Sequence, residues 1–249
     1  MNDYITDIYR IAGRDIQICS LYQEVHQYCR EYRAPEARRL ALQAGEQADL
    51  SVQITTQDID YESAADQKLQ HFSDSYREGL AVCRKISEYM PSCDTFLFHA
   101  SAVAVDGRAY LFAAASGTGK STHTRLWREL LGERAVTIND DKPFVGITPR
   151  KAVVYGSPWC GKHRLGANIC VPLKAVCILE RSEKNQICRI SPGEAYPMLL
   201  QQVYRPKQPE MMKKTLQLID RLTELTEFYR LGCNMDLDAA RLSYETMKA

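Results

Sequence analysis

A loop with two glycines, placed between an apolar run and a helical segment, gives the clearest chemical signal in the sequence. It reads Ala114-Ala-Ser-Gly-Thr-Gly-Lys-Ser-Thr122 and fits a phosphate-binding loop pattern, with alanine where the first glycine is usual. Because Gly117 and Gly119 lack a Cβ, the backbone can curl and direct several N–H groups at one anion. The helix expected over Lys120–Leu131 adds its positive end. The loop therefore predicts a polyphosphate-binding site.

The side chains around these glycines divide the work of holding a nucleotide. Lys120 would contact the β- and γ-phosphate oxygens, and the Ser121 hydroxyl would ligate Mg²⁺. The residues expected to bind the nucleotide are Ser116, Gly117, Thr118, Gly119, Lys120, Ser121 and Thr122. The alternative is a glycine-rich turn that only opens a helix, and the strand predicted immediately before the loop favours the nucleotide site.

Two adjacent acids, Asp140 and Asp141, closely follow the predicted strand Ala135–Ile138. A carboxylate at a strand end beside a phosphate loop is where the metal-holding acid of a P-loop enzyme belongs. One carboxylate can hold Mg²⁺ while its neighbour accepts a proton from an attacking hydroxyl. The alternative is an acidic turn between strands, which would be the ordinary interpretation of the pair away from such a loop.

The segment Gly156–Arg164 is a third candidate, since a proline, a tryptophan and two glycines accompany three potentially cationic side chains. Lys162 or Arg164 would neutralise charge on a moving phosphoryl group, because one lysine is seldom enough for that transfer. The alternative is a surface loop in which Trp159 packs locally and the charges are solvated.

Short strands and hairpins must position these residues. Thr95–Val105 and Arg108–Ala115 are predicted as two strands joined by an Asp106-Gly107 turn, and the second runs into the loop. Further strands are expected over Asp15–Cys19, Leu50–Ile54, Ala135–Ile138, Val176–Leu179, Gln186–Ile190 and Phe228–Leu231, with a hairpin near Thr148–Lys151. Val176–Leu179 and Gln186–Ile190 are expected to pair across a polar turn. Leu21–Tyr32 fits an edge segment or a short helix equally well.

Helical spacing supplies the flanking elements. Apolar residues from Ala65 to Met90 recur in steps of three and four, which predicts one helix of roughly 40 Å that ends at Pro91. Further helices are expected over Glu210–Glu227 and Asp236–Met247. The fold class is therefore mixed α/β, with a hairpin-rich mixed sheet and flanking helices. We expect an amino-terminal α+β extension over residues 1–94 and a catalytic domain with a helical tail over residues 95–249.

Composition narrows the classes of function. The chain has 249 residues, of which 45% are hydrophobic and 25% charged, and a formal net charge of +1, which argues against a dedicated nucleic-acid binder. The longest apolar run, Ala109–Ala115, is too short to cross a bilayer. The opening residues lack a basic region followed by an apolar stretch, so we expect no secretion signal and a cytoplasmic protein.

The cysteines fit reduced core thiols better than a metal site. There are nine, an odd number, and no CxxC pair occurs among them. A zinc site at Cys160, His163, Cys170 and Cys177 is conceivable, but the spacing matches no familiar ligand pattern.

The region of about residues 95–190 resembles the catalytic domain of the HPr kinase/phosphorylase family and, more distantly, the ATP-dependent phosphoenolpyruvate carboxykinases. The likeness rests on Phe98-His-Ala-Ser101, the Asp106-Gly107 hairpin, the loop Ser116–Thr122 and Asp140-Asp141. It implies a P-loop core of that type, with ATP and Mg²⁺ as cofactors and His99 near the transferred phosphate. A satisfied core histidine is the alternative for His99, which is flanked by apolar residues.

The resemblance also assigns roles to the acids. Asp140 is taken as the base and Asp141, together with Ser121, as the metal contact, although the two aspartates are interchangeable on this reasoning. Two features depart from the family. The segment before Thr95 does not look like its regulatory domain, and Gly156–Arg164 stands where an Arg-Gly signature is expected. The chain looks more like the smaller HPr-kinase-related proteins, some of which modify peptides.

The expected activity is transfer of the γ-phosphoryl group of ATP to a hydroxyl, first of all a serine of a protein or peptide. Alternatives are a small-molecule kinase or carboxykinase-like enzyme, and a nucleotide-binding switch without turnover. The expected partners are a nucleotide and a protein, peptide or small-molecule acceptor, with neither nucleic acid nor membrane. The resemblance is also consistent with a homo-oligomer.

Overall fold

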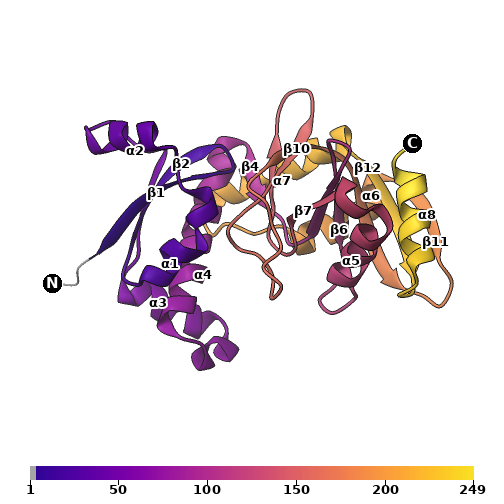
Figure 1. Cartoon of the computed structure of the whole chain (residues 1–249), viewed down its shortest axis with the longest axis horizontal. Helices are drawn as coiled ribbons and strands as arrows, with labels where there is room; N and C mark the ends of the chain where they lie inside the picture. Colours follow the sequence, from indigo (N-terminus) through magenta and orange to yellow (C-terminus); the bar gives the residue numbers. More distant parts are fainter. Residues whose placement is uncertain (1–3) are drawn as a thin grey trace. The chain divides into compact units, whose positions relative to one another are not determined.

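The computed structural model describes residues 4–249, and the chain divides into two compact units, Met1–Tyr89 and Met90–Ala249 (Figure 1). The functional division predicted at residue 94 stays a prediction. The first unit contains β1 (Ile5–Ile11), β2 (Arg14–Ser20), α1 (Gln23–Tyr28), η1 (Arg30–Tyr32), α2 (Glu36–Gln43), β3 (Leu50–Gln53), α3 (Thr56–Ala65), η2 (Gln67–His71) and α4 (Asp74–Tyr89). Its sheet has the order β1-β2-β3, with β1 antiparallel and β3 parallel to β2.

The long helix expected over residues 65–90 is wrong in extent, because the chain breaks it twice. The carboxylate of Asp66 accepts the backbone N–H of Lys68 and caps η2. The hydroxyl of Ser73 then accepts the N–H of Tyr76, so that α4 starts at Asp74. Local side-chain caps therefore override an apolar periodicity that runs across them. The undecided segment after β2 forms the helix α1, followed by the short turn η1.

The second unit holds one curled mixed sheet between helices. Its elements are η3 (Met90–Cys93), β4 (Thr95–Leu97), β5 (Ser101–Val105), β6 (Arg108–Ala113), α5 (Lys120–Leu131), η4 (Gly132–Arg134), β7 (Ala135–Asn139), β8 (Phe144–Ile147), β9 (Ala152–Tyr155), β10 (Cys170–Arg181), β11 (Gln186–Ile190), α6 (Pro192–Gln202), α7 (Pro209–Leu225), β12 (Glu227–Cys233) and α8 (Leu237–Met247). The strand order is β4-β8-β9-β10-β6-β5-β7, and β12 pairs with both β10 and β11. A mixed α/β fold is thereby confirmed.

Strand directions bring several chain segments to one edge of this sheet. Both β6 and β7 run antiparallel to β5, so they are parallel to each other. Strand β10 is parallel to β6, and β12 is parallel to β10. The carboxyl ends of β6, β7, β10 and β12 therefore meet the amino end of β5. We call this the carboxyl edge, and connections at such an edge are where α/β folds place their binding sites.

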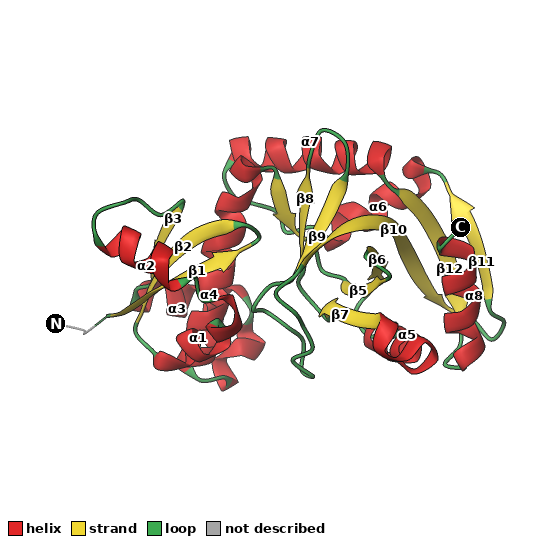
Figure 2. Ribbon diagram, turned by 45° about the horizontal axis from the view of Figure 1, so that its top comes forward, coloured by secondary structure: helices red, strands yellow, loops and turns green. Residues whose placement is uncertain are grey.

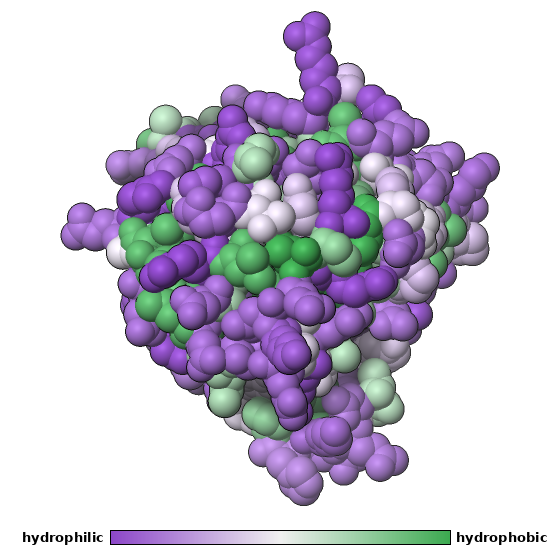
Figure 3. All heavy atoms as spheres, turned by 90° about the vertical axis from the view of Figure 1, so that its right-hand side faces the viewer, coloured by the Kyte–Doolittle hydropathy of each residue, from purple (hydrophilic) through white to green (hydrophobic). Residues whose placement is uncertain are grey.

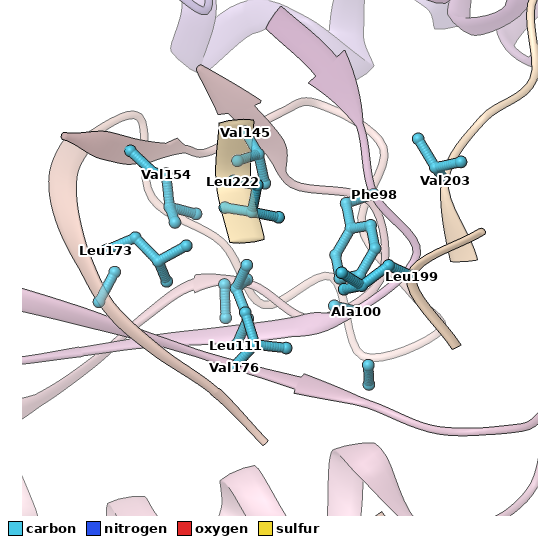
Figure 4. Packing of buried hydrophobic residues seen from close by; sticks show 14 of the residues in the cluster. Phe98, Ala100, Leu111, Val145, Val154, Leu173, Val176, Leu199, Val203 and Leu222 are labelled. Atoms are coloured by element: carbon cyan, nitrogen blue, oxygen red, sulfur yellow. The ribbon is translucent and has the colours of Figure 1, made fainter. Parts of the chain in front are cut away.

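Helices cover both faces of the sheet, which explains why its central strands are apolar throughout. On one face α6 and α7 pack against alternate residues such as Leu111 of β6 and Val176 of β10 (Figures 2 and 4). On the other, α5 and α8 pack against Phe112 and Cys177, the next residues along the same strands. Successive side chains of a strand point to opposite faces, so each strand contributes to both cores.

The helices α5 and α8 are joined by a buried polar contact as well as by packing. The indole N–H of Trp127 donates to Ser243 Oγ at 2.8 Å, and His123 Nε2 lies 3.0 Å from the same oxygen. Trp127 also packs edge-on against Phe112 and Tyr244. These contacts fix α5, the helix that follows the predicted phosphate loop, on the rest of the unit.

Two predicted strand arrangements are wrong because pairing is decided by distant residues. Gln186–Ile190 forms β11 as expected, but it pairs with β12, which lies between β11 and β10. The strand expected over Thr95–Val105 is divided into β4 and β5, which pair with different partners. Between them the His99 N–H donates to the carbonyl of Gln202, outside either ladder.

No helix among residues 4–249 is both long and apolar enough to span a membrane. At the α8 and β11 end of the second unit, hydrophilic side chains cover most of the surface, and hydrophobic atoms form smaller patches between them (Figure 3).

Candidate functional site

The loop of residues 114–119, called the glycine loop below, joins β6 to α5 at the carboxyl edge. Gly117 has φ of 77° and Gly119 has φ of 121°, both in the left-handed region. A Cβ at either position would meet nothing within 4 Å, so the requirement for glycine lies in the backbone conformation. The helix begins at Lys120 and ends at Leu131, as the sequence predicts. Ser116 and Gly117 are exposed, so a ligand can reach the loop.

Lys120 folds back over this loop. Its Nζ donates to the carbonyl of Ala114 at 3.2 Å. Burial lowers the pKa of Lys120, and the carboxylate of Asp141 acts in the opposite direction, so the two groups are within electrostatic reach. Ser121 is exposed, and no described residue forms a hydrogen bond with its hydroxyl. Both side chains can therefore turn to an anion or a metal in the loop.

Asp140 is a buried carboxyl held by backbone groups. Its Oδ1 accepts the N–H of Gly161 at 2.6 Å, and its own carbonyl accepts the hydroxyl of Ser101. Burial raises the pKa of Asp140 above its ordinary value, against the opposing effect of backbone hydrogen bonds, first of all that from Gly161. A Cβ at position 161 would lie 3.2 Å from Asp140 Oδ2, so the glycine permits this close approach.

The pKa of Asp141, the next residue, is shifted in the opposite direction. His99 Nε2 lies 3.1 Å from its Oδ1, and Lys142 Nζ lies 2.8 Å from its Oδ2. Burial alone would raise the pKa of Asp141, but hydrogen bonds from His99 and Lys142 outweigh it and lower the pKa to about 2. The His99 side chain is 41% exposed, which is not the setting of a core histidine. The pair thus holds one carboxyl whose pKa is raised and one whose pKa is lowered.

Asn139 organises the acidic turn, and sequence reasoning missed this role. Its Oδ1 accepts the N–H groups of Asp141 at 2.8 Å and Lys142 at 2.6 Å. Its Nδ2 donates to the carbonyl and the hydroxyl of Ser157 at 3.0 and 3.1 Å, and the residue is fully buried. The available signal was an asparagine directly before the two acids, since Asn side chains readily bond backbone groups two or three residues ahead.

The segment Gly156–Arg164 meets the acids through its backbone rather than through its cations. Gly161 contacts Asp140, and the Trp159 ring is buried edge-on against Phe144. Lys162 and Arg164 have exposed side chains on the turn that begins at Gly161, closed by the bond from Arg164 N–H to the Gly161 carbonyl. The predicted role of these two cations in phosphoryl transfer therefore stays a prediction.

Arg181 supplies a cation that no motif indicated. It ends β10, and its Nη2 donates to the carbonyl of Gly117 at 2.5 Å. Beside it lies a pocket of about 690 Å³, lined by the glycine loop, Thr122, His123 and the residues that follow β10 and β12. The only sequence signal was an arginine at the end of an apolar strand, and its neighbours become apparent only from the strand order.

The residues proposed for Mg²⁺ fit that ion in part. Ser121 offers a hydroxyl that has no hydrogen-bond partner among residues 4–249. Asp141 offers a charged carboxylate whose oxygens already contact His99 and Lys142. Magnesium commonly takes one or two protein oxygens and completes its shell with phosphate and water. In residues 4–249 no cluster of three or more His, Cys, Asp or Glu side chains could hold a metal. An ion here would therefore depend on a bound phosphate for most of its ligands.

Comparison with protein families gives one match. A family model described as SynChlorMet cassette protein ScmC covers residues 80–231, which is more than half of the chain. The chain belongs to the ScmC family. The part shared with ScmC proteins starts within α4 and ends within β12, so it includes the glycine loop, both aspartates, His99 and Arg181.

The other comparisons add little to the ScmC assignment. A search of curated proteins gives no match. Among solved structures, the Hpr(Ser) kinase/phosphatase from Coxiella burnetii aligns with 61% of this chain and 99% of its own, at 9% sequence identity and a TM-score of 0.35. A likeness of this degree supports no argument about the site.

Proposed function

We propose that this ScmC-family chain is an ATP- and Mg²⁺-dependent kinase that transfers the γ-phosphoryl group to a hydroxyl, in the first place a serine of a protein or peptide. One observation carries the proposal. The glycine loop with Lys120 lies at the same sheet edge as two adjacent carboxyls, Asp140 and Asp141, whose pKa values are shifted in opposite directions. Separated acid–base properties at one site are typical of catalysis. The sequence resemblance to HPr kinases supports a P-loop core of that type.

In this proposal the glycine loop and the start of α5 bind the phosphates. Backbone N–H groups around Gly117 and Gly119 and the positive end of α5 would bind the triphosphate. Lys120 would exchange the carbonyl of Ala114 for phosphate oxygens, since its present bond is to a neutral acceptor. Ser121 and Asp141 would hold Mg²⁺, which supplies charge neutralisation at the phosphates.

Asp140 is the base that the electrostatics favour. A carboxyl with a raised pKa takes a proton more readily than Asp141, which His99 and Lys142 keep ionised. In the transfer, the acceptor O–H gives its proton to Asp140 while its oxygen bonds to the γ-phosphorus. The bond from that phosphorus to the bridging oxygen breaks, ADP leaves, and the proton is later released to solvent.

His99 and the exposed cations have supporting roles in this proposal. His99 would hold Asp141 and lie near the transferred group, as the family resemblance implies. Lys162 and Arg164 would neutralise charge on the phosphoryl group once an acceptor is bound. Both side chains are exposed, so a bound substrate could reach them.

The test is incubation with γ-labelled ATP, Mg²⁺ and a pool of synthetic peptides that each contain one serine, with the full chain and its Asp140→Asn variant. Asp238→Asn, an exposed aspartate of the same unit, is the matched control. Label on serine that needs Asp140 but not Asp238 supports the proposal. Label on added small hydroxyl or carboxylate compounds alone would indicate a small-molecule kinase or carboxykinase-like enzyme. Nucleotide binding with negligible turnover would indicate a nucleotide-binding switch and contradict the proposed kinase activity.

A further inference from the structure

The pocket beside the glycine loop, at the ends of β10 and β12, lies opposite the acids. From β6, which carries the loop, Asp140 is reached across β5 and β7, whereas the pocket is reached across β10 and β12. Neighbouring strands are about 4.8 Å apart, so each side lies roughly 10 Å from the loop. We propose that this pocket, with Arg181 and Met235 as its contact residues, binds the nucleoside part of a purine nucleotide. The inference rests on the proposed function.

The direction of a bound triphosphate decides the assignment. If its γ-phosphate is next to Asp140 and Asp141, its other end must extend away from them, past Gly117 and over the start of α5. Thr122 and His123, from the first turn of that helix, line the pocket. A ligand anchored at the loop can therefore extend along the start of α5 into the pocket, whose lining also includes Gly117 and Gly119.

Met235 gives the pocket an apolar surface suited to a flat ring. Its side chain is 76% exposed, which is unusual for so large an apolar group in the second unit. The backbone beneath it is held, because Asn234 N–H donates to Asn185 Oδ1 at 2.9 Å and the Asn234 amide donates to Asp236 at 2.7 Å. An ordered segment that exposes a thioether is well placed for sulfur–aromatic contact with a purine.

Arg181 adds a planar cation at the junction of loop and pocket. Its guanidinium already bonds the Gly117 carbonyl, so it lies where the first phosphate meets the nucleoside. Guanidinium groups bind phosphate oxygens and also stack on aromatic rings. Either contact favours a nucleotide over a free phosphate chain.

His123 provides an independent sign of a missing partner. Ser243 Oγ donates to the carbonyl of Ala240, so its lone pairs accept from Trp127 and from His123 Nε2. This arrangement places the ring proton on Nε2 and leaves Nδ1 as an acceptor. Nδ1 is buried and has no hydrogen-bond partner within the described chain, although His123 lines the pocket. After a small movement of the His123 side chain, its Nδ1 could accept a hydrogen bond from a hydroxyl or amino group of a nucleoside.

The test compares two ligands that share phosphates and differ in the nucleoside. Affinities of ADP and of inorganic pyrophosphate, each with Mg²⁺, are measured by calorimetry on the full chain and on Met235→Ser. We expect ADP to bind more tightly than pyrophosphate to the unchanged protein. The variant should lose about three- to tenfold in ADP affinity and keep its pyrophosphate affinity. Met235→Leu should restore most of the loss, and Val136→Ser, an exposed apolar residue on β7, should change neither affinity.

The outcomes separate the two proposals. Equal binding of ADP and pyrophosphate, or a Met235→Ser variant with unchanged ADP affinity, overturns the nucleoside pocket and leaves the phosphate site standing. Failure of both ligands to bind the unchanged protein contradicts the glycine-loop assignment itself, and with it the proposed function.

Discussion

The two sides of the glycine loop are built differently. Toward β5 and β7, hydrogen bonds and ion pairs form a network in which buried Asn139 orders the turn and Asp140 and Asp141 both have partners. Toward β10 and β12, the pocket has an exposed methionine and an arginine bonded to the loop. A reacting centre gains from preorganised groups, whereas a site that only binds can use exposed ones. Under the proposed function, chemistry therefore belongs to the first side and nucleoside affinity to the second.

The largest effect should come from the side of the loop that holds Asp140 and Asp141, called the acid side below. Asp140→Asn removes the proton acceptor while keeping the side chain's size, so transfer should fall by about 10²- to 10⁴-fold. Nucleotide affinity should stay nearly unchanged, because the phosphates contact other groups. Single-turnover assays and calorimetry measure the two quantities. A variant that transfers phosphate at the normal rate would move the base to another residue, first of all Asp141.

Lys120→Ala tests the loop that both sides share. Loss of a charged donor to phosphate should weaken ATP binding roughly 10- to 100-fold. Titration calorimetry with ATP and Mg²⁺ measures this, with Lys151→Ala, an exposed lysine in the turn between β8 and β9, as the control. Unchanged affinity would mean that the ammonium group stays on the Ala114 carbonyl when nucleotide is bound.

Asn139→Ala should destabilise the acid side without touching the pocket. It leaves the N–H groups of Asp141 and Lys142 without their acceptor, which should lower the free energy of unfolding by about 2–4 kcal/mol. In the folded fraction kcat should fall while the affinity for ADP is retained. Urea unfolding followed by circular dichroism, with kinetics on the same samples, distinguishes a positioning role from general instability.

Acid should stop the proposed phosphoryl transfer before it destabilises the region around Asp140 and Asp141. The base form of Asp140 is lost as pH falls through a pKa above 3.8, so transfer should drop about tenfold per pH unit below that point. Asp141, with its pKa lowered to about 2, stabilises the fold above pH 3.8, and this stability is lost only as pH falls from about 4 to 2. Rate–pH profiles and unfolding followed against pH should therefore separate. Coincident losses would count against the split assignment.

The smallest effect is expected at Lys162. Its side chain is exposed, so Lys162→Ala should reduce transfer by only about two- to fivefold and leave nucleotide binding alone. Initial rates at saturating ATP measure this. A loss as large as that of Asp140→Asn would show that the turn Gly161–Arg164 closes on the reacting group.

Local signals explain what the sequence predicted well. The strand, glycine loop and helix around Lys120 are contiguous, and the Asp106-Gly107 turn adopts the positive φ values that such a pair supplies, 49° and 75°. The nearness of Lys120 and Asp141 is predicted by the position of the two acids at the end of a strand beside a phosphate loop, and the resemblance adds only their separate roles. Asn139 could have been found from its position before the acids.

Pairing between distant segments explains which parts of the fold and of the site could not be predicted from the sequence. β11 bonds to β12 rather than to β10 because β12, which comes later in the chain, inserts between them. Arg181 reaches the loop only because β10 lies next to β6, a neighbour that no local pattern reveals. The contacts that define the pocket are therefore consequences of topology.

The hydroxyl of Ser243 joins the carboxy-terminal helix α8 to α5, the helix that follows the glycine loop. It receives the indole of Trp127, whose helix starts at Lys120, and α8 itself begins two residues after Met235. Displacing α8 would leave the Trp127 indole N–H buried without an acceptor. It would also loosen both the start of α5 and the segment at Met235, the two parts of the proposed nucleotide site that α8 supports. Bound nucleotide should therefore make α8 harder to unfold, even though no atom of α8 contacts the ligand.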